Sequence, residues 1–94
     1  MEQRELSFNE QNGYYISEEK VNADYNLHIE MEEEKGSVEI YQRGSDSGEY
    51  RRVYTQTGWG KVVDADFQHA VYPKYIKIKV RSKVVMATIR EADV

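Results

Sequence analysis

The sequence contains no cysteine and only one proline in its 94 residues. The lack of cysteine excludes disulfide bonds and thiolate metal sites, and it leaves the redox compartment open. No apolar run approaches the roughly 18 residues that a membrane-spanning helix needs, and no repeat or linker-like tract divides the chain. We therefore expect one domain over residues 1–94, with fraying at residues 1–5 and 91–94.

Alternation of apolar and polar residues is clearest between Val21 and Glu32, where every odd-numbered residue is apolar and every even-numbered residue is polar. A helix would scatter those apolar side chains around its circumference, whereas a strand places them all on one face. We predict a twelve-residue strand here, buried on one side and solvated on the other. The polar run 32–36 then predicts a hairpin turn into a second strand, Ser37–Arg43.

Shorter alternating segments follow along the chain. They predict strands over Tyr50–Thr57, around Val63–Phe67, over Tyr75–Arg81 and over Val84–Arg90, while Asn12-Gly13 predicts a hairpin turn near the N-terminus. No segment has a helical pattern. Short strands with turn signals about every ten residues are typical of an antiparallel β-sandwich of about seven strands, jelly-roll or immunoglobulin-like; a partly open β-barrel is the alternative.

Charge is divided unevenly along the chain. Residues 1–50 hold 13 acidic and 4 basic residues, and residues 51–94 hold 4 acidic and 9 basic ones, for a net charge of −4. Either the second half forms a basic surface for an acidic partner, or acidic and basic strands lie side by side in one sheet. We favour the second interpretation, because opposite charges stabilise strand pairing. It predicts that Glu30 and Glu32 neighbour Lys77 and Lys79.

Residues suited to catalysis are scarce. His28 and His69 are the only side chains that normally titrate near neutrality, and an exposed strand histidine is commoner than a catalytic one. Asp64 and Asp66 share one face of a predicted strand but would need further ligands to hold a cation. Nucleophile motifs such as GxSxG are absent. We expect no enzyme, no cofactor and no metal site.

Aromatic residues are plentiful, with eight tyrosines, two phenylalanines and one tryptophan. Trp59, between two glycines, is interpreted as a core plug at the end of the sandwich or, alternatively, as an exposed anchor. Tyr54 and Tyr75 are candidate stacking residues. Asp46 lies at the tip of the loop GSDSGE, and end loops often contact ligands in sandwich domains.

Basic residues recur along the segment 74–83. In the predicted strand, Lys77 and Lys79 lie on the same face as Tyr75. Cations beside a stacking platform suit single-stranded nucleic acid. The overall acidity argues against that partner, provided that the glutamates of Val21–Glu32 neutralise the lysines.

The segments VEIYQRGSDSGEYRRV and YPKYIKIKV resemble strands of discoidin-type sugar-binding sandwiches, in which a turn-containing hairpin precedes a closing aromatic and basic strand. The resemblance covers about a third of the chain. It implies a β-sandwich with a carbohydrate ligand, and no residue role is transferred from it.

By elimination, we expect a non-catalytic binding or interaction module for a glycan or a protein, belonging to a larger surface or secreted protein. The alternative is an intracellular single-stranded nucleic-acid-binding domain that uses residues 74–83. An extracellular or cell-envelope location is slightly favoured, and no oligomeric state is predicted. The candidate ligand-binding residues are Trp59, Tyr54, Asp46, Tyr75, Lys77 and Lys79.

Overall fold

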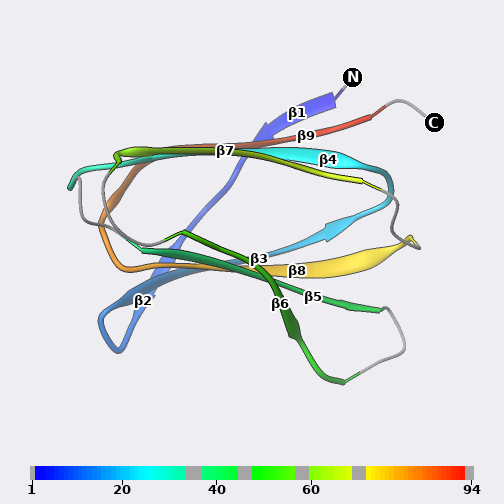
Figure 1. The fold of residues 1–94 in the computed structure, drawn as a ribbon, viewed down its shortest axis with the longest axis horizontal. Coiled ribbons are helices and arrows are strands. Elements are labelled where there is room, and N and C mark those ends of the chain that lie inside the picture. Colours follow the sequence, from blue (N-terminus) through cyan, green and yellow to red (C-terminus); the bar gives the residue numbers. More distant parts are fainter. Residues whose placement is uncertain (1, 34–36, 45–47, 57–59, 69–71, 93–94) are drawn as a thin grey trace.

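The computed structural model describes residues 2–33, 37–44, 48–56, 60–68 and 72–92. These residues form nine strands and no helix, in two antiparallel sheets that lie face to face (Figure 1). The four-stranded sheet has the order β1-β9-β4-β7, and the five-stranded sheet has the order β2-β3-β8-β5-β6. The strands are β1 (Glu2–Glu5), β2 (Asn9–Gln11), β3 (Tyr14–Val21), β4 (Tyr25–Met31), β5 (Val38–Gly44), β6 (Arg51–Gln56), β7 (Val62–Phe67), β8 (Lys74–Val80) and β9 (Val84–Glu91).

The strand pairs are nested. β5 pairs with β6, β4 with β7, β3 with β8 and β1 with β9, and successive pairs alternate between the two sheets. This is the jelly-roll order, with β2 added at the edge of one sheet. The predicted antiparallel β-sandwich is confirmed, and its jelly-roll version is the one that the chain adopts. Within the described residues no helix is long and apolar enough to cross a membrane.

The core lies between the sheets and is built from the alternating residues of the central strands. Leu27 and Ile29 of β4 and Ile76 and Ile78 of β8 are completely buried. Strands β4 and β8 each contribute every second residue to this core, because successive side chains point to opposite faces. The apolar set of β8 therefore leaves Tyr75, Lys77 and Lys79 on the outer face of the five-stranded sheet.

The predicted single strand over Val21–Glu32 is wrong in its boundaries. The chain bends at residues 22–24, so that Val21 ends β3 in one sheet and Tyr25 begins β4 in the other. Both strands turn their odd-numbered side chains toward the shared core, so Val21 and Tyr25 are both buried. The alternation therefore continues through a bend that the pattern itself does not reveal.

The predicted hairpin across residues 32–36 is also wrong, since β4 and β5 lie in different sheets. Three of those residues, 34–36, lie outside the described part of the chain. The hairpin at Asn12-Gly13 is confirmed between β2 and β3. Asn12 has a φ of 53° and Gly13 a φ of 84°, and two positive φ values are what the tight hairpin turn matching the strand twist requires.

Candidate functional site

The outer face of the five-stranded sheet gathers aromatic and basic side chains. Residues directly opposite each other in a pair of strands share a face. The registers of β8 with β3 and β5 therefore place six residues on one surface: Glu18, Lys20, Tyr41, Arg43, Tyr75 and Lys77. Lys79 lies there too, opposite Ile16 of β3 and Glu39 of β5. We call this surface the aromatic–basic face.

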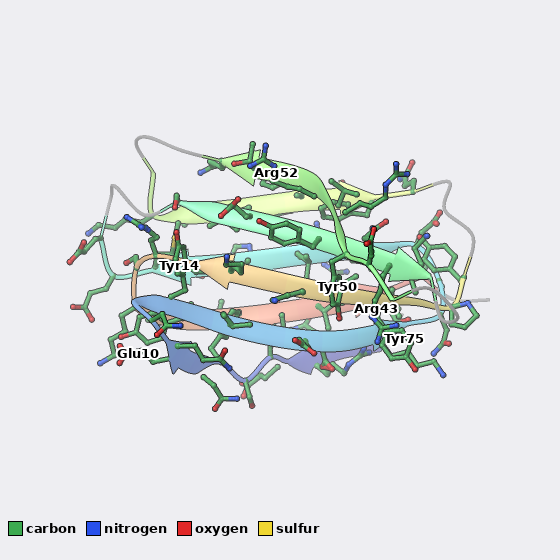
Figure 2. The ribbon with its side chains drawn as sticks, turned by 90° about the horizontal axis from the view of Figure 1, so that it is seen from below. Glu10, Tyr14, Arg43, Tyr50, Arg52 and Tyr75 are labelled. Atoms are coloured by element: carbon green, nitrogen blue, oxygen red, sulfur yellow. The ribbon has the colours of Figure 1, made fainter. Side chains whose placement is uncertain are left out.

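Cations lie over the tyrosine rings in two clusters on this face. In the first, the guanidinium carbon of Arg43 is 4.2 Å from the centre of the Tyr75 ring and 5.3 Å from that of Tyr50, and Lys77 Nζ is 5.7 Å from the centre of Tyr50. Figure 2 shows Arg43, Tyr50 and Tyr75 close together on this surface. At these distances the ring faces attract the cations.

The second cluster surrounds Tyr14, which lies away from the first cluster in Figure 2. Lys79 Nζ is 4.5 Å from the centre of the Tyr14 ring and 5.9 Å from that of Tyr41, and the guanidinium carbon of Arg81 is 4.9 Å from the centre of Tyr14. Tyr75 and Lys79 are four residues apart on β8, so about 13 Å separates their Cα atoms along the strand. The face is therefore extended rather than a single pocket.

Positive charge exceeds negative charge on the aromatic–basic face. The registers and ring contacts place six cationic side chains there but only two acidic ones. The cations are Lys20, Arg43, Arg52, Lys77, Lys79 and Arg81, and the acids are Glu18 and Glu39. Among the residues that the structure describes, no carboxylate lies within ion-pair distance of Lys77, Lys79 or Arg81. Among the described residues, the side chains placed on this face by register and ring contact thus carry four more positive than negative charges, in a chain whose net charge is −4.

Glu39 lies within this basic surface and is held ionised by it. The Tyr41 hydroxyl donates a hydrogen bond to Glu39 Oε2 at 2.9 Å, and Arg52 donates to the same oxygen at 3.3 Å. The hydrogen bond from Tyr41, helped by Arg52 and by the nearby charge of Lys79, holds the pKa of Glu39 below its usual range despite partial desolvation. Glu39 therefore connects Tyr41 of β5 with Arg52 of β6 on this face.

The predicted neighbours of the lysines are wrong. Glu30 belongs to β4, which pairs with β7 and β9 in the four-stranded sheet, and Glu32 follows that strand. Lys77 and Lys79 belong to β8 in the other sheet, where they lie opposite Glu18 and Glu39. Acidic and basic residues do lie side by side, as the favoured interpretation holds, but two acids cannot balance the cations of this face.

The opposite outer face, on the four-stranded sheet, is acidic. Nδ1 of the His28 ring is 2.9 Å from Asp64 Oδ2 and Nε2 is 2.9 Å from Glu30 Oε2, so both ring nitrogens lie within hydrogen-bond distance of a carboxylate. Hydrogen bonds first to Asp64 and then to Glu30 raise the pKa of His28 above its ordinary value. The side-chain amide of Asn26 donates to both Asp64 and Asp66. The two faces of the sandwich thus carry opposite charge.

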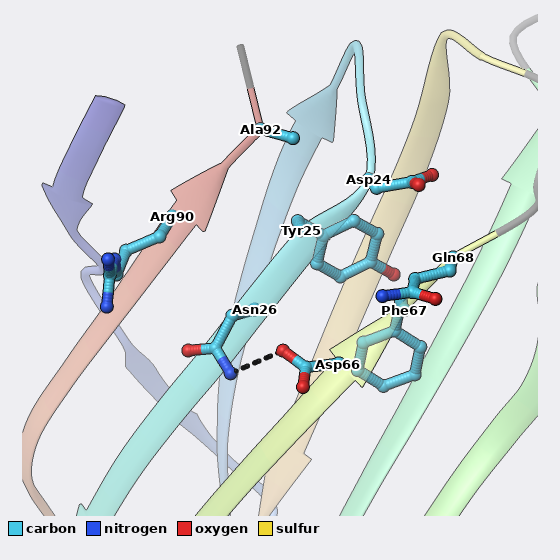
Figure 3. Close-up of a pocket in the computed structure, with 8 residues that line it drawn as sticks. All are labelled: Asp24, Tyr25, Asn26, Asp66, Phe67, Gln68, Arg90 and Ala92. Carbon is cyan, nitrogen blue, oxygen red and sulfur yellow. Dashed lines mark hydrogen bonds between the residues drawn. The ribbon is translucent and has the colours of Figure 1, made fainter. Parts of the chain in front are cut away.

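A pocket of about 140 Å³ lies at the end of the four-stranded sheet (Figure 3). The ring of Tyr25 stacks on Phe67 with 4.9 Å between the ring centres, and Asn26, Asp66 and Arg90 are among the polar residues of its lining. Burial raises the pKa of Tyr25 to about 12, so its hydroxyl stays protonated. Pockets for small molecules usually measure about 300–1,000 Å³, so this one is too small to be the main site.

The structure unites only part of the predicted site. Tyr75, Lys77 and Lys79 share the aromatic–basic face, whereas Tyr54 packs against the core at Phe67 and donates a hydrogen bond to Gln56. Asp46, Trp59 and His69 lie outside the described residues. Tyr14, Tyr41, Tyr50 and Arg43 were not predicted as site residues. Tyr41 and Arg43 alternate on one strand, which could have suggested a common face. Only the strand order shows that β3, β5 and β8 are neighbours.

Comparison of the chain with protein-family models, with curated proteins and with solved structures finds no match. The chemistry of the aromatic–basic face is therefore the basis for a functional proposal.

Proposed function

We propose that this chain is a non-catalytic module that binds single-stranded nucleic acid on the aromatic–basic face. The observation that carries the proposal is the combination of four tyrosine rings with a surplus of four positive charges on one extended surface. Proteins that bind single strands combine cations that track the phosphates with aromatic rings on which the bases stack. Arginine planes also stack on bases, and Arg43 lies among the rings.

The overall acidity of the chain argues against nucleic acid only if the glutamates of Val21–Glu32 neutralise Lys77 and Lys79. They do not, because β4 lies in the other sheet. Net charge matters less than its distribution when a ligand contacts one face. The acidic groups Glu30, Asp64 and Asp66 lie on the opposite outer face. A polyanion that approaches the aromatic–basic face is attracted by the nearer cations, since salt screens charges beyond about 8 Å at physiological ionic strength.

A neutral glycan fits this face less well. The six cations can donate hydrogen bonds to a neutral ligand, but they gain no charge attraction from it. An anionic ligand, in contrast, gains from every cation that its phosphates approach.

Two observations support a non-catalytic role. Both ring nitrogens of His28 lie at hydrogen-bond distance from carboxylates of its own sheet, so the ring is engaged on both sides. The pocket at the end of the four-stranded sheet is smaller than a usual substrate pocket. The extended face instead suits a polymer.

The test is fluorescence anisotropy with a labelled oligothymidylate of about ten nucleotides, a length within the range that single-strand-binding folds cover. We expect saturable binding to the wild-type protein and its loss in the double variant Lys77→Glu/Lys79→Glu. The matched control is Lys61→Glu/Lys83→Glu, which changes the net charge equally at the sandwich end near Met31 and Glu32. Retained binding in the first variant, or equal loss in the control, would exclude the aromatic–basic face. Binding to a neutral glycan array without binding to the oligonucleotide would favour the carbohydrate alternative.

A further inference from the structure

The strand order leaves four edge strands: β1 and β7 in one sheet, and β2 and β6 in the other. An edge strand can pair with another chain unless it is short, bulged or charged with basic residues. Strands β1 and β2 have only four and three residues. Strand β6 is bulged where its register with β5 shifts, and it carries Arg51 and Arg52. These three edges are therefore protected against pairing.

Strand β7 is neither short nor bulged nor basic, and its charged residues are the acids Asp64 and Asp66. It has six residues, pairs with β4 in an unbroken register from Val62 to Phe67, and contains no lysine, arginine or proline. Within the part of the chain that the structure describes, β4 is its only strand partner. The backbone groups on its other side are therefore available to a further strand.

Val63 of β7 is buried, but the next two inner side chains of this strand, Ala65 and Phe67, are incompletely covered. Leu27 of β4 is fully buried, whereas Ala65, directly opposite it, is only partly buried, and so is Phe67. Both belong to the partly buried residues that pack against the core. A strand added at this edge would place apolar side chains beside Ala65 and Phe67 and extend the core.

The outer side chains of β7 specify the charge of such a strand. Asp64 and Asp66 lie at alternate positions, and the side chain of Asp64 is 57% exposed although it is hydrogen-bonded to His28 and Asn26. In an antiparallel pair of two β7 strands, these acids would face acids of the second copy, and like charges opposite each other are destabilising. Lysine or arginine at alternate positions would instead be stabilised.

We propose that β7 is a docking edge for an extended peptide segment in which lysine or arginine alternates with apolar residues. The segment extends the four-stranded sheet by one antiparallel or parallel strand, so that backbone hydrogen bonds hold it and the alternating side chains set its specificity. Its basic side chains face Asp64 and Asp66, and its apolar ones face Ala65 and Phe67. This edge belongs to the sheet opposite the aromatic–basic face, so the inference does not depend on the proposed nucleic-acid ligand.

The probe is a capped peptide of alternating lysine and valine, followed by amide NMR on the wild-type protein. We expect shift changes and hydrogen-exchange protection concentrated in β7 amides. A glutamate–valine peptide should bind about tenfold more weakly, because two favourable charge pairs become unfavourable. A lysine–valine peptide with alternate amides N-methylated should lose binding, because it cannot complete the strand ladder.

Reversing a charge on the protein provides a second test of the proposed peptide binding. Asp66→Lys reverses one of the two charge pairs, so it should weaken binding of the lysine–valine peptide about threefold and strengthen binding of the glutamate–valine peptide. Glu33→Lys, an equal charge change outside β7, should leave both affinities unchanged. Equal binding of the two peptides to wild type, undiminished binding of the N-methylated peptide, or no response of β7 amides would overturn the proposal. So would a protein dimer that forms without peptide and protects the β7 amides, since a second copy would then be the occupant.

Discussion

The salt dependence of oligonucleotide binding gives the proposed function a magnitude. The aromatic–basic face has a surplus of four positive charges. For single strands the logarithm of the association constant falls with the logarithm of salt concentration by about 0.7 per neutralised phosphate, so four phosphates predict a slope of about −3. Raising the salt concentration from about 50 to about 200 mM should therefore weaken binding about 50-fold.

The perturbation is again Lys77→Glu/Lys79→Glu, which removes two cations and adds two acids. The surplus on the face falls to zero, and the slope should become nearly flat. Anisotropy titrations at a series of sodium chloride concentrations measure it for the wild type, for this variant and for Lys61→Glu/Lys83→Glu. The control variant Lys61→Glu/Lys83→Glu should keep a slope of about −3. A wild-type slope shallower than about −1, or equal flattening in both variants, would refute the charge count as the source of affinity.

Three further predictions concern stacking, packing and pH. Tyr75→Ala should weaken oligonucleotide binding about 5- to 150-fold, the range for losing one stacked base, while Tyr75→Phe keeps the ring and should bind nearly normally in the same anisotropy assay. Ile78→Ala, at a fully buried position of β8, should lower the free energy of unfolding in urea by about 2–5 kcal/mol; a loss below about 1 kcal/mol would contradict the core assignment. The raised pKa of His28 means that its stabilising contribution is complete below its unfolded pKa near 6.5 and is lost as pH rises through the folded value. Wild type should therefore exceed His28→Gln in stability between about pH 5 and 6, where the carboxylates are still ionised, and lose that advantage at high pH. A constant difference in urea unfolding across the series would contradict the carboxylate contacts.

Much of the fold follows from alternation alone. The apolar sets of β8 and β7 and the Asn12-Gly13 turn were predictable because each depends on neighbouring residues in the sequence. The bend between Val21 and Tyr25 was not predictable. Both flanking strands face the same core, so the alternation of apolar and polar residues continues through the bend unchanged. The sequence contains no comparable local pattern that predicts which distant strands pair.

The candidate site shows the same division. Tyr75, Lys77 and Lys79 share a face because they alternate on one strand, and the sequence predicts this directly. Their actual neighbours come from β3 and β5, which are separated from β8 by many residues. The expected partners Glu30 and Glu32 were inferred from charge without a strand order, and the order places them in the other sheet.

The most direct test of the proposed function is an amide NMR titration of the wild-type protein with the oligothymidylate. We predict that shift changes concentrate on β3, β5 and β8, including the amides of Tyr14, Tyr41 and Tyr75, and that β4, β7 and β9 change little. Changes confined to the four-stranded sheet, or no change at oligonucleotide concentrations that saturate the anisotropy signal, would contradict binding on the aromatic–basic face.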